Sequence, residues 1–101
     1  MPAVTIKFAP FTVMRDMYGQ PCRKSFVKDN LSHYTSISVD IGLDTAPGEE
    51  VAEEVFDLSN NPSRENERAT VYGNHRSVSV GDVVGVDGVD YLCDSFGWVV
   101  L

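Results

Sequence analysis

The chain has 101 residues, of which 43% are hydrophobic and 23% charged, and its formal net charge is −7. At this length we expect a single domain over residues 1–101 with one modest core. The composition excludes an intrinsically disordered chain, and no apolar run approaches the roughly 20 residues of a membrane-spanning helix.

The N-terminal stretch "MPAVTIKFAP" lacks the pattern of a secretory signal, so we expect a cytoplasmic protein with no membrane contact. Cys22 and Cys93 are too few for a disulfide framework, and we expect both to be thiols. Residues 1–34 hold five basic and two acidic groups, whereas the remainder holds three basic and thirteen acidic groups. An acidic surface repels phosphate backbones and disfavours general nucleic-acid binding. Two interpretations stay open: solubility, or imitation of nucleic acid toward a basic protein.

The first half of the chain predicts two strands. Residues 3–14, "AVTIKFAPFTVM", alternate until Pro10, which indicates an edge strand bent or ended at the proline. Gly19 and Pro21 then mark a turn. Residues 33–44, "HYTSISVDIGLD", alternate again and predict the most regular strand of this half.

Over residues 44–62 the hydrophobic period changes from two to about 3.6, which predicts an amphipathic helix. Asp44 or Thr45 can cap this helix, and Pro47 suits its first turn. Asn60, Asn61 and Pro62 end it. A second, shorter and mostly polar helix is expected on the surface over residues 62–73.

The last quarter of the chain predicts a meander of short strands. Asp87-Gly88 is a two-residue hairpin signal, because a type I′ turn needs positive φ at both central positions. The turn pairs Val86 with Val89, Gly85 with Asp90, Val84 with Tyr91, and Val83 with Leu92. One face then carries Val84, Val86, Val89, Tyr91 and Cys93, and we expect it to be core. Gly85 leaves the other face thin, either for close backbone approach or for a bend.

Residues 96–101 return as a final strand, which we expect to lie inside the β-structure. Together these elements predict an α+β fold. It consists of a small antiparallel β-sheet or partly open barrel, with one amphipathic helix and one short helix packed on it.

The stretch "HRSVSVGDVVGVDGVDYLCDSFGWVVL", with its "SVSVGDVV", "DG" and "CDSFGW" elements, resembles the C-terminal segment of YodL-like domains. The preceding run "VFDLSNNPSRENERATVYG" resembles the segment that leads into it, so the resemblance covers residues 55–101. It implies an accessory protein of bacterial plasmids, phages or integrative elements. It implies no catalytic residues.

Metal and cofactor chemistry is not indicated. Asp87, Asp90 and Asp94 do not have the spacing of an EF-hand loop. His33 and His75 are isolated from cysteines and acids at any metal-ligand spacing. We therefore expect turn formers and exposed strand residues at these positions, with no metal and no cofactor.

Catalysis is not indicated either. A reactive thiol needs an electropositive, partly exposed setting, whereas Cys93 falls on the expected core face beside an acid. No phosphate loop, nucleophile elbow or metalloprotease signature is present. We expect a protein that is not an enzyme and has no catalytic residues.

Two surfaces are candidates for binding. The first is an acidic stripe opposite the apolar stripe of the predicted helix, formed by Glu49, Glu50, Glu53, Glu54 and Asp57. This stripe is either a solvated face or a surface that engages a basic groove, where charge complementarity speeds association. The second is a cluster at the exit of the shorter helix that can stack a base or hold a phosphate, formed by Tyr72, Asn74, His75 and Arg76. Phe96 and Trp98 share a strand face and form either core or a stacking platform.

From these features we expect a non-enzymatic protein that binds a host protein or protein complex through the acidic stripe. Its specific form is an inhibitor of a nucleic-acid-handling or defence complex, of the anti-CRISPR or anti-restriction type. The alternative is a small RNA- or nucleotide-binding module of PUA-like or OB-like character. It would use the Tyr72–Arg76 cluster together with the early basic residues, which are Lys7, Arg15, Arg23, Lys24 and Lys28. The sequence does not indicate an oligomeric state.

Overall fold

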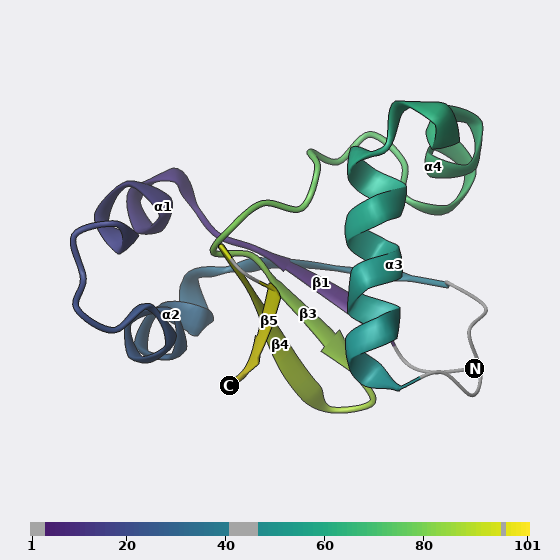
Figure 1. The fold of residues 1–101 in the computed structure, drawn as a ribbon. Coiled ribbons are helices and arrows are strands. Elements are labelled where there is room, and N and C mark those ends of the chain that lie inside the picture. Colours follow the sequence, from purple (N-terminus) through teal and green to yellow (C-terminus); the bar gives the residue numbers. More distant parts are fainter. Residues whose placement is uncertain (1–3, 41–46, 96) are drawn as a thin grey trace.

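A computed structural model describes residues 4–40, 47–95 and 97–101. Within these ranges five strands form an antiparallel sheet in the order β2-β1-β3-β4-β5 (Figure 1). The strands are β1 Val4–Phe8, β2 Thr35–Val39, β3 Val83–Val86, β4 Val89–Asp94 and β5 Gly97–Val100. The sheet stays open, with β2 and β5 at its edges. The α+β prediction is therefore confirmed in its open-sheet form, and the partly open barrel is not what forms.

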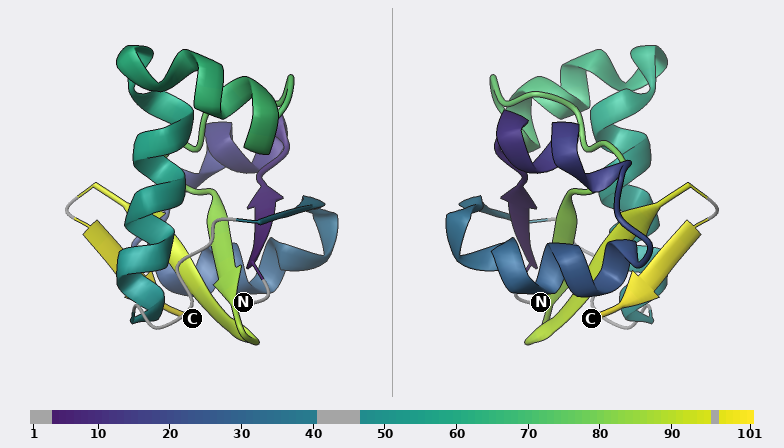
Figure 2. Two further views of the ribbon diagram at one scale, coloured as in Figure 1. Left: turned by 90° about the vertical axis from the view of Figure 1, so that its right-hand side faces the viewer. Right: turned by 90° about the vertical axis from the view of Figure 1, so that its left-hand side faces the viewer.

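Helices cover both faces of this sheet. Helices α3 (Gly48–Asn60) and α4 (Glu65–Val71) lie on one side, and α1 (Phe11–Met17) and α2 (Arg23–Asn30) lie on the other (Figures 1 and 2). Single turns of 3-10 helix, Leu31–His33 and Pro62–Arg64, follow α2 and precede α4. In the described part of the chain, no helix combines the length and apolar character needed to cross a membrane.

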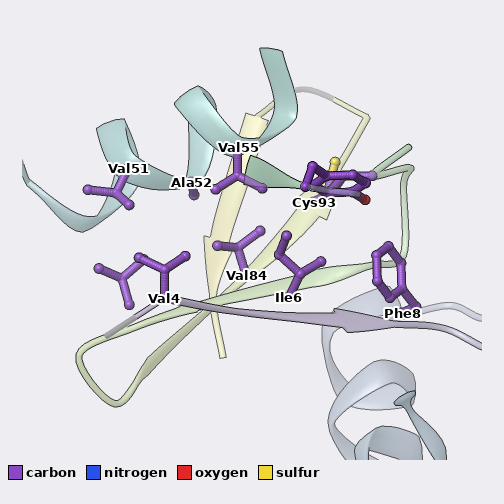
Figure 3. Packing of buried hydrophobic residues seen from close by; sticks show 11 residues of the cluster. Val4, Ile6, Phe8, Val51, Ala52, Val55, Val84 and Cys93 are labelled. Atoms are coloured by element: carbon purple, nitrogen blue, oxygen red, sulfur yellow. The ribbon is translucent and has the colours of Figure 1, made fainter. Parts of the chain in front are cut away.

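The main core lies between α3 and the sheet. Residues three and four apart share a helix face, so Val51, Ala52 and Val55 all point from α3 toward the sheet (Figure 3). They meet alternate residues of the central strands, including Ile6 and Val84. All five of these side chains are fully buried, and burial of this kind is the dominant favourable term in folding.

A second core lies on the opposite face of the sheet. Val83 and Leu92 point to this side, where they pack with Val13 and Met17 of α1 and Val27 of α2. The sheet therefore lies between two apolar clusters and contributes side chains to both.

The predicted edge position of the first strand is wrong. β1 pairs with β2 on one side and with β3 on the other. Pro10 lies two residues beyond Phe8, so its missing N–H falls outside the ladder. Pro10 instead occupies the N-cap position of α1 with φ of −67°, which is the value that the proline ring imposes. The prediction that the final strand lies inside the β-structure is also wrong. β5 is an edge strand, and Val100 is 51% exposed.

The predicted helices of the second half are confirmed, with adjusted ends. Pro47 occupies the N-cap of α3, and the predicted caps Asp44 and Thr45 lie outside the described residues. The shorter helix divides into the 3-10 turn Pro62–Arg64 and α4, and the Asn61 side chain accepts from the Ser63 N–H at its start. β2 is shorter than predicted, and residues 41–44 of that prediction also lie outside the described ranges.

The predicted hairpin register is confirmed at every pair from Val83↔Leu92 to Val86↔Val89. Asp87 and Gly88 have φ of 50° and 86°, as a type I′ turn requires. Because Gly85 has no side chain, an ion pair between Lys7 of β1 and Asp90 of β4 passes over β3 at this position. Lys7 Nζ lies 2.9 Å from both carboxylate oxygens of Asp90, and a Cβ at Gly85 would lie 2.9 Å from Asp90 Oδ1.

This close approach predicts a specific cost for Gly85→Ala. The added methyl has to displace a carboxylate held by Lys7, so we expect a loss of about 1–2 kcal/mol in the free energy of unfolding, measured with urea. Gly19→Ala is the matched control, because its Cβ would meet nothing closer than 3.7 Å. Equal stability of the two variants would contradict the assigned role of Gly85.

Candidate functional site

The acidic residues of α3 lie on the side of the helix that faces away from the sheet. Val51, Val55 and Leu58 fill the buried side. The carboxylates occupy the opposite side, and they belong to Glu49, Glu50, Glu53, Glu54 and Asp57. Four of them are exposed, and Glu54 is half-buried. The structure therefore brings the predicted acidic stripe together on one surface, called the acidic face below.

Arg64 divides the acidic face into two parts. Its guanidinium donates to Glu54, to Asp57 Oδ2 at 2.8 Å and to Glu67 Oε2 at 2.6 Å. These hydrogen bonds, that of Glu67 above all, raise the pKa of Arg64 above its ordinary value. The same contact with Arg64 lowers the pKa of Glu67. The C-terminal part of the acidic face is thus partly neutralised and held in place.

The N-terminal part of the acidic face keeps its charge. Glu49 and Glu50 occupy the first turn of α3, where the helix dipole favours anions. Neither carboxylate has an ion-pair partner among the described residues, and both are exposed. This turn is therefore the part of the acidic face with the most uncompensated negative charge.

Glu53 connects the acidic face to the edge of the sheet. The indole Nε1 of Trp98 donates to Glu53 Oε2 at 2.7 Å. The Trp98 ring also packs edge-to-face on Phe56, with centroids 6.3 Å apart and planes at 86°. Trp98 is half-buried, so the structure places it between the two predicted alternatives, core and exposed platform. Phe96 lies outside the described residues.

The Tyr72–Arg76 cluster forms around Phe8 of β1. Tyr72 is 3% exposed and packs edge-to-face on Phe8, while the His75 ring stacks on the same phenylalanine at 5.9 Å. The Tyr72 hydroxyl donates to the carbonyl of Arg76. Asn74, His75 and part of Arg76 remain exposed. The aromatic member of this cluster therefore packs in the core, with its polar members at the rim.

Arg76 is bound to the buried carboxylate of Asp82, which lies just before β3. Its two terminal nitrogens donate to Asp82 Oδ2 at 2.6 Å and to Asp82 Oδ1 at 2.7 Å. Asp82 is 0% exposed, and its oxygens also accept the N–H groups of Ala9 and Ser79, each at 2.8 Å. A buried charge is tolerated only when it is paired and fully hydrogen-bonded, and Asp82 meets that condition.

The remaining candidate groups are dispersed. Asp90 binds Lys7, Asp94 binds Arg23, and Asp87 forms the hairpin turn. In residues 4–40, 47–95 and 97–101, no three His, Cys, Asp or Glu side chains gather as a metal ion would need. Burial, followed by nearby carboxylates, raises the pKa of Cys93 to about 12, so this thiol is neutral near pH 7. Its predicted place on the core face is confirmed.

Of the five early basic residues, Lys7 lies in β1 and the other four lie in the layer of α1 and α2. Arg15 binds its neighbour Asp16, and Arg23 donates to Asp94 and Ser95. Lys24 and Lys28 are exposed. The structure therefore separates these residues from the Tyr72–Arg76 cluster, which closes the core on the α3 side.

No known protein family, curated protein or solved structure matches this chain.

We expect Asp82→Asn to destabilise the protein strongly. The amide cannot satisfy four donors and leaves the Arg76 guanidinium without its counter-charge, so the expected loss is about 3 kcal/mol in the free energy of unfolding. Urea denaturation followed by circular dichroism measures it. Asp29→Asn, at an exposed position in α2, should stay within about 0.5 kcal/mol of the parent protein. A similarly small change for Asp82→Asn would contradict the role given to this network.

A second prediction concerns alkaline pH. Burial, the main cause, raises the pKa of Tyr34 and that of Tyr72 from 10.0 to about 12. The unfolded chain loses these protons first, so the stabilisation is complete below about pH 10 and is lost as the pH rises toward about 12. Urea midpoints at several pH values should fall over this window. Tyr34→Phe should flatten the fall, whereas Tyr18→Phe, which removes the hydroxyl of a 67% exposed residue, should not.

Proposed function

We propose that this chain is a non-enzymatic accessory protein of a bacterial mobile element that binds a basic surface of a host protein through the acidic face of α3. It acts in the cytoplasm. In its specific form it inhibits a nucleic-acid-handling or defence complex, as anti-CRISPR and anti-restriction proteins do. The resemblance of residues 55–101 to YodL-like domains supports the mobile-element origin.

The observation that carries the proposal is the separation of charge between the two helical layers. The layer from Gly48 to Val71 contains seven acidic residues and two arginines, whereas the layer from Phe11 to His33 contains four basic and two acidic residues. The layers lie on opposite sides of the sheet (Figure 2). Such a dipolar distribution orients the molecule as it approaches a charged partner and raises the association rate.

The spacing of the carboxylates supports nucleic-acid imitation. Glu49 and Asp57 are eight residues apart, which is about 12 Å along a helix at 1.5 Å per residue. The five carboxylates thus follow one another in alternating axial steps of about 1.5 and 4.5 Å. Their mean spacing of about 3 Å is close to the axial spacing of about 3.4 Å between phosphates along one strand of DNA. A groove that binds a phosphate backbone therefore finds a similar axial density of carboxylates on α3, with Arg64 offsetting part of the charge of Glu54 and Asp57.

Both arginines of the acidic layer are already occupied. Arg64 holds three carboxylates. Arg68 donates to the carbonyls of Ser59, Gly73 and His75 and lies over the Tyr72 ring at 4.9 Å. Neither guanidinium is available to fold over Glu49 and Glu50, so the N-terminal turn of α3 is the part of the layer best suited to a basic partner.

Reversal of this charge tests the proposal. Glu49→Lys/Glu50→Lys should abolish the capture of partner proteins from a bacterial lysate, measured by quantitative mass spectrometry. The protein should stay folded, with a loss of about 1–2 kcal/mol in the free energy of unfolding, because lysines replace the anions that the helix dipole favours in the first turn of α3. Asp29→Lys/Asp40→Lys makes the same change in net charge at exposed positions away from α3, and it should retain the captured proteins.

Two results would contradict the proposal. One is capture that survives the α3 reversal. The other is capture that disappears after nuclease treatment, together with binding of short RNA or single-stranded DNA at about 50 mM salt; this would favour the nucleic-acid-binding alternative.

A further inference from the structure

The described surface contains a small hollow where α3 meets the end of the β4–β5 hairpin. Its volume is about 240 Å³, and it is lined by Glu53, Phe56, Val80, Cys93, Asp94, Ser95, Gly97 and Trp98. Pockets for small organic ligands usually measure about 300–1,000 Å³. The hollow is below that range, so its size suits one amino-acid side chain better than a metabolite or cofactor.

The lining combines apolar and aromatic side chains with two carboxylates. Phe56, Val80 and Trp98 supply the walls, while Glu53 and Asp94 supply carboxylates. None of the described residues that line the hollow is a lysine or an arginine. The occupant that such a site favours has an apolar stem and a cationic head, as lysine and arginine do.

The charged and aromatic groups of the hollow are held in position before any ligand arrives. Glu53 uses only Oε2 to accept from Trp98, which leaves Oε1 as an acceptor. The edge-to-face contact with Phe56 fixes the indole ring. The Asp94 carboxylate is held by Arg23 and by the Ser95 N–H, which lies 2.7 Å from Asp94 Oδ1. Groups held in this way cost little entropy to order on binding.

Arginine fits this arrangement better than lysine. Its planar guanidinium stacks on an aromatic face and donates several hydrogen bonds at once, whereas an ammonium is a point charge. Trp98 offers the ring and Glu53 the free carboxylate oxygen. Arg23 already donates to both Asp94 and Ser95 from the α2 side, and this partly offsets the charge of Asp94. Glu53 is therefore the carboxylate that decides the affinity.

We propose that this hollow is a specificity subsite of the acidic face that takes one arginine side chain of the basic partner, stacked on Trp98 and bound by Glu53. The inference rests on the proposed function, since it names the side chain that the acidic face selects. It also predicts that a basic partner inserts an arginine at the α3–β5 edge while its other cations lie along α3.

The test uses the whole protein and a defined probe. Trp98 is the only tryptophan of the chain, so its fluorescence reports directly on the hollow. Titration with N-acetyl-arginine amide should give a saturable change at low salt. The lysine analogue should bind more weakly, and the neutral citrulline analogue should give no saturable change.

A matched pair of variants separates the subsite from general electrostatics. Glu53→Gln keeps an oxygen to accept from Trp98 but removes the charge, and we expect about tenfold weaker binding of the arginine probe, or about 1.4 kcal/mol. Glu50→Gln makes the same charge change on the same helix outside the hollow, and we expect less than a twofold effect. Urea midpoints identify any variant that does not fold.

The proposal is overturned if the arginine probe gives no saturable change, or if Glu50→Gln weakens binding as much as Glu53→Gln. Failure of the proposed function is seen separately, because partner capture is tested by reversing Glu49 and Glu50, which do not line the hollow. If capture depends on Glu49 and Glu50 but the arginine probe does not bind, the acidic face stands without the subsite.

Discussion

The carboxylate of Asp82 joins the two halves of this chain. It accepts the N–H of Ala9, just beyond β1, and the guanidinium of Arg76, which follows α4. Next to it, the carbonyl of Gly81 accepts the hydroxyl of Tyr34 from the first half at 2.7 Å. A carboxylate removed from water is costly unless every acceptor site is used. The cost is met only when β1, the loop before β3 and the exit of α4 are all in place, so this one group favours a single arrangement of the sheet and its helices.

The same constraint determines how the acidic face is presented. The segment that returns from α4 to the sheet is held by Arg76 and Asp82 at one end and by the carbonyl contacts of Arg68 at the other. Ser59, at the buried end of α3, accepts the Val78 N–H through its hydroxyl. The acidic helix is therefore fixed against the sheet at its C-terminal end as well as through its apolar side, and its surface carboxylates keep a defined geometry. A surface of this kind loses little conformational entropy when it meets a partner.

Sequence reasoning succeeded where the signal is local. The turn chemistry of Asp87-Gly88 determines the β3–β4 register, and the 3.6-residue period of Val51, Val55 and Leu58 identifies α3. It missed α1 and α2, because helices of seven and eight residues are marginal in isolation and depend on tertiary packing. It found the acidic stripe but not the Arg64 clamp or the bond between Trp98 and Glu53. The latter joins residues 45 positions apart, and no spacing rule indicates such a pair.

The strand order has a consequence for how the molecule is made. β1 is synthesised first, yet its neighbour β3 begins only at Val83, and the Lys7–Asp90 ion pair spans 83 positions. During synthesis on the ribosome, the edge of β1 that pairs with β3 therefore stays unpaired until most of the described chain has emerged. Contacts this distant in sequence slow folding and leave strand edges exposed to other chains. The sheet is therefore completed late, when β3 emerges and pairs with the open side of β1.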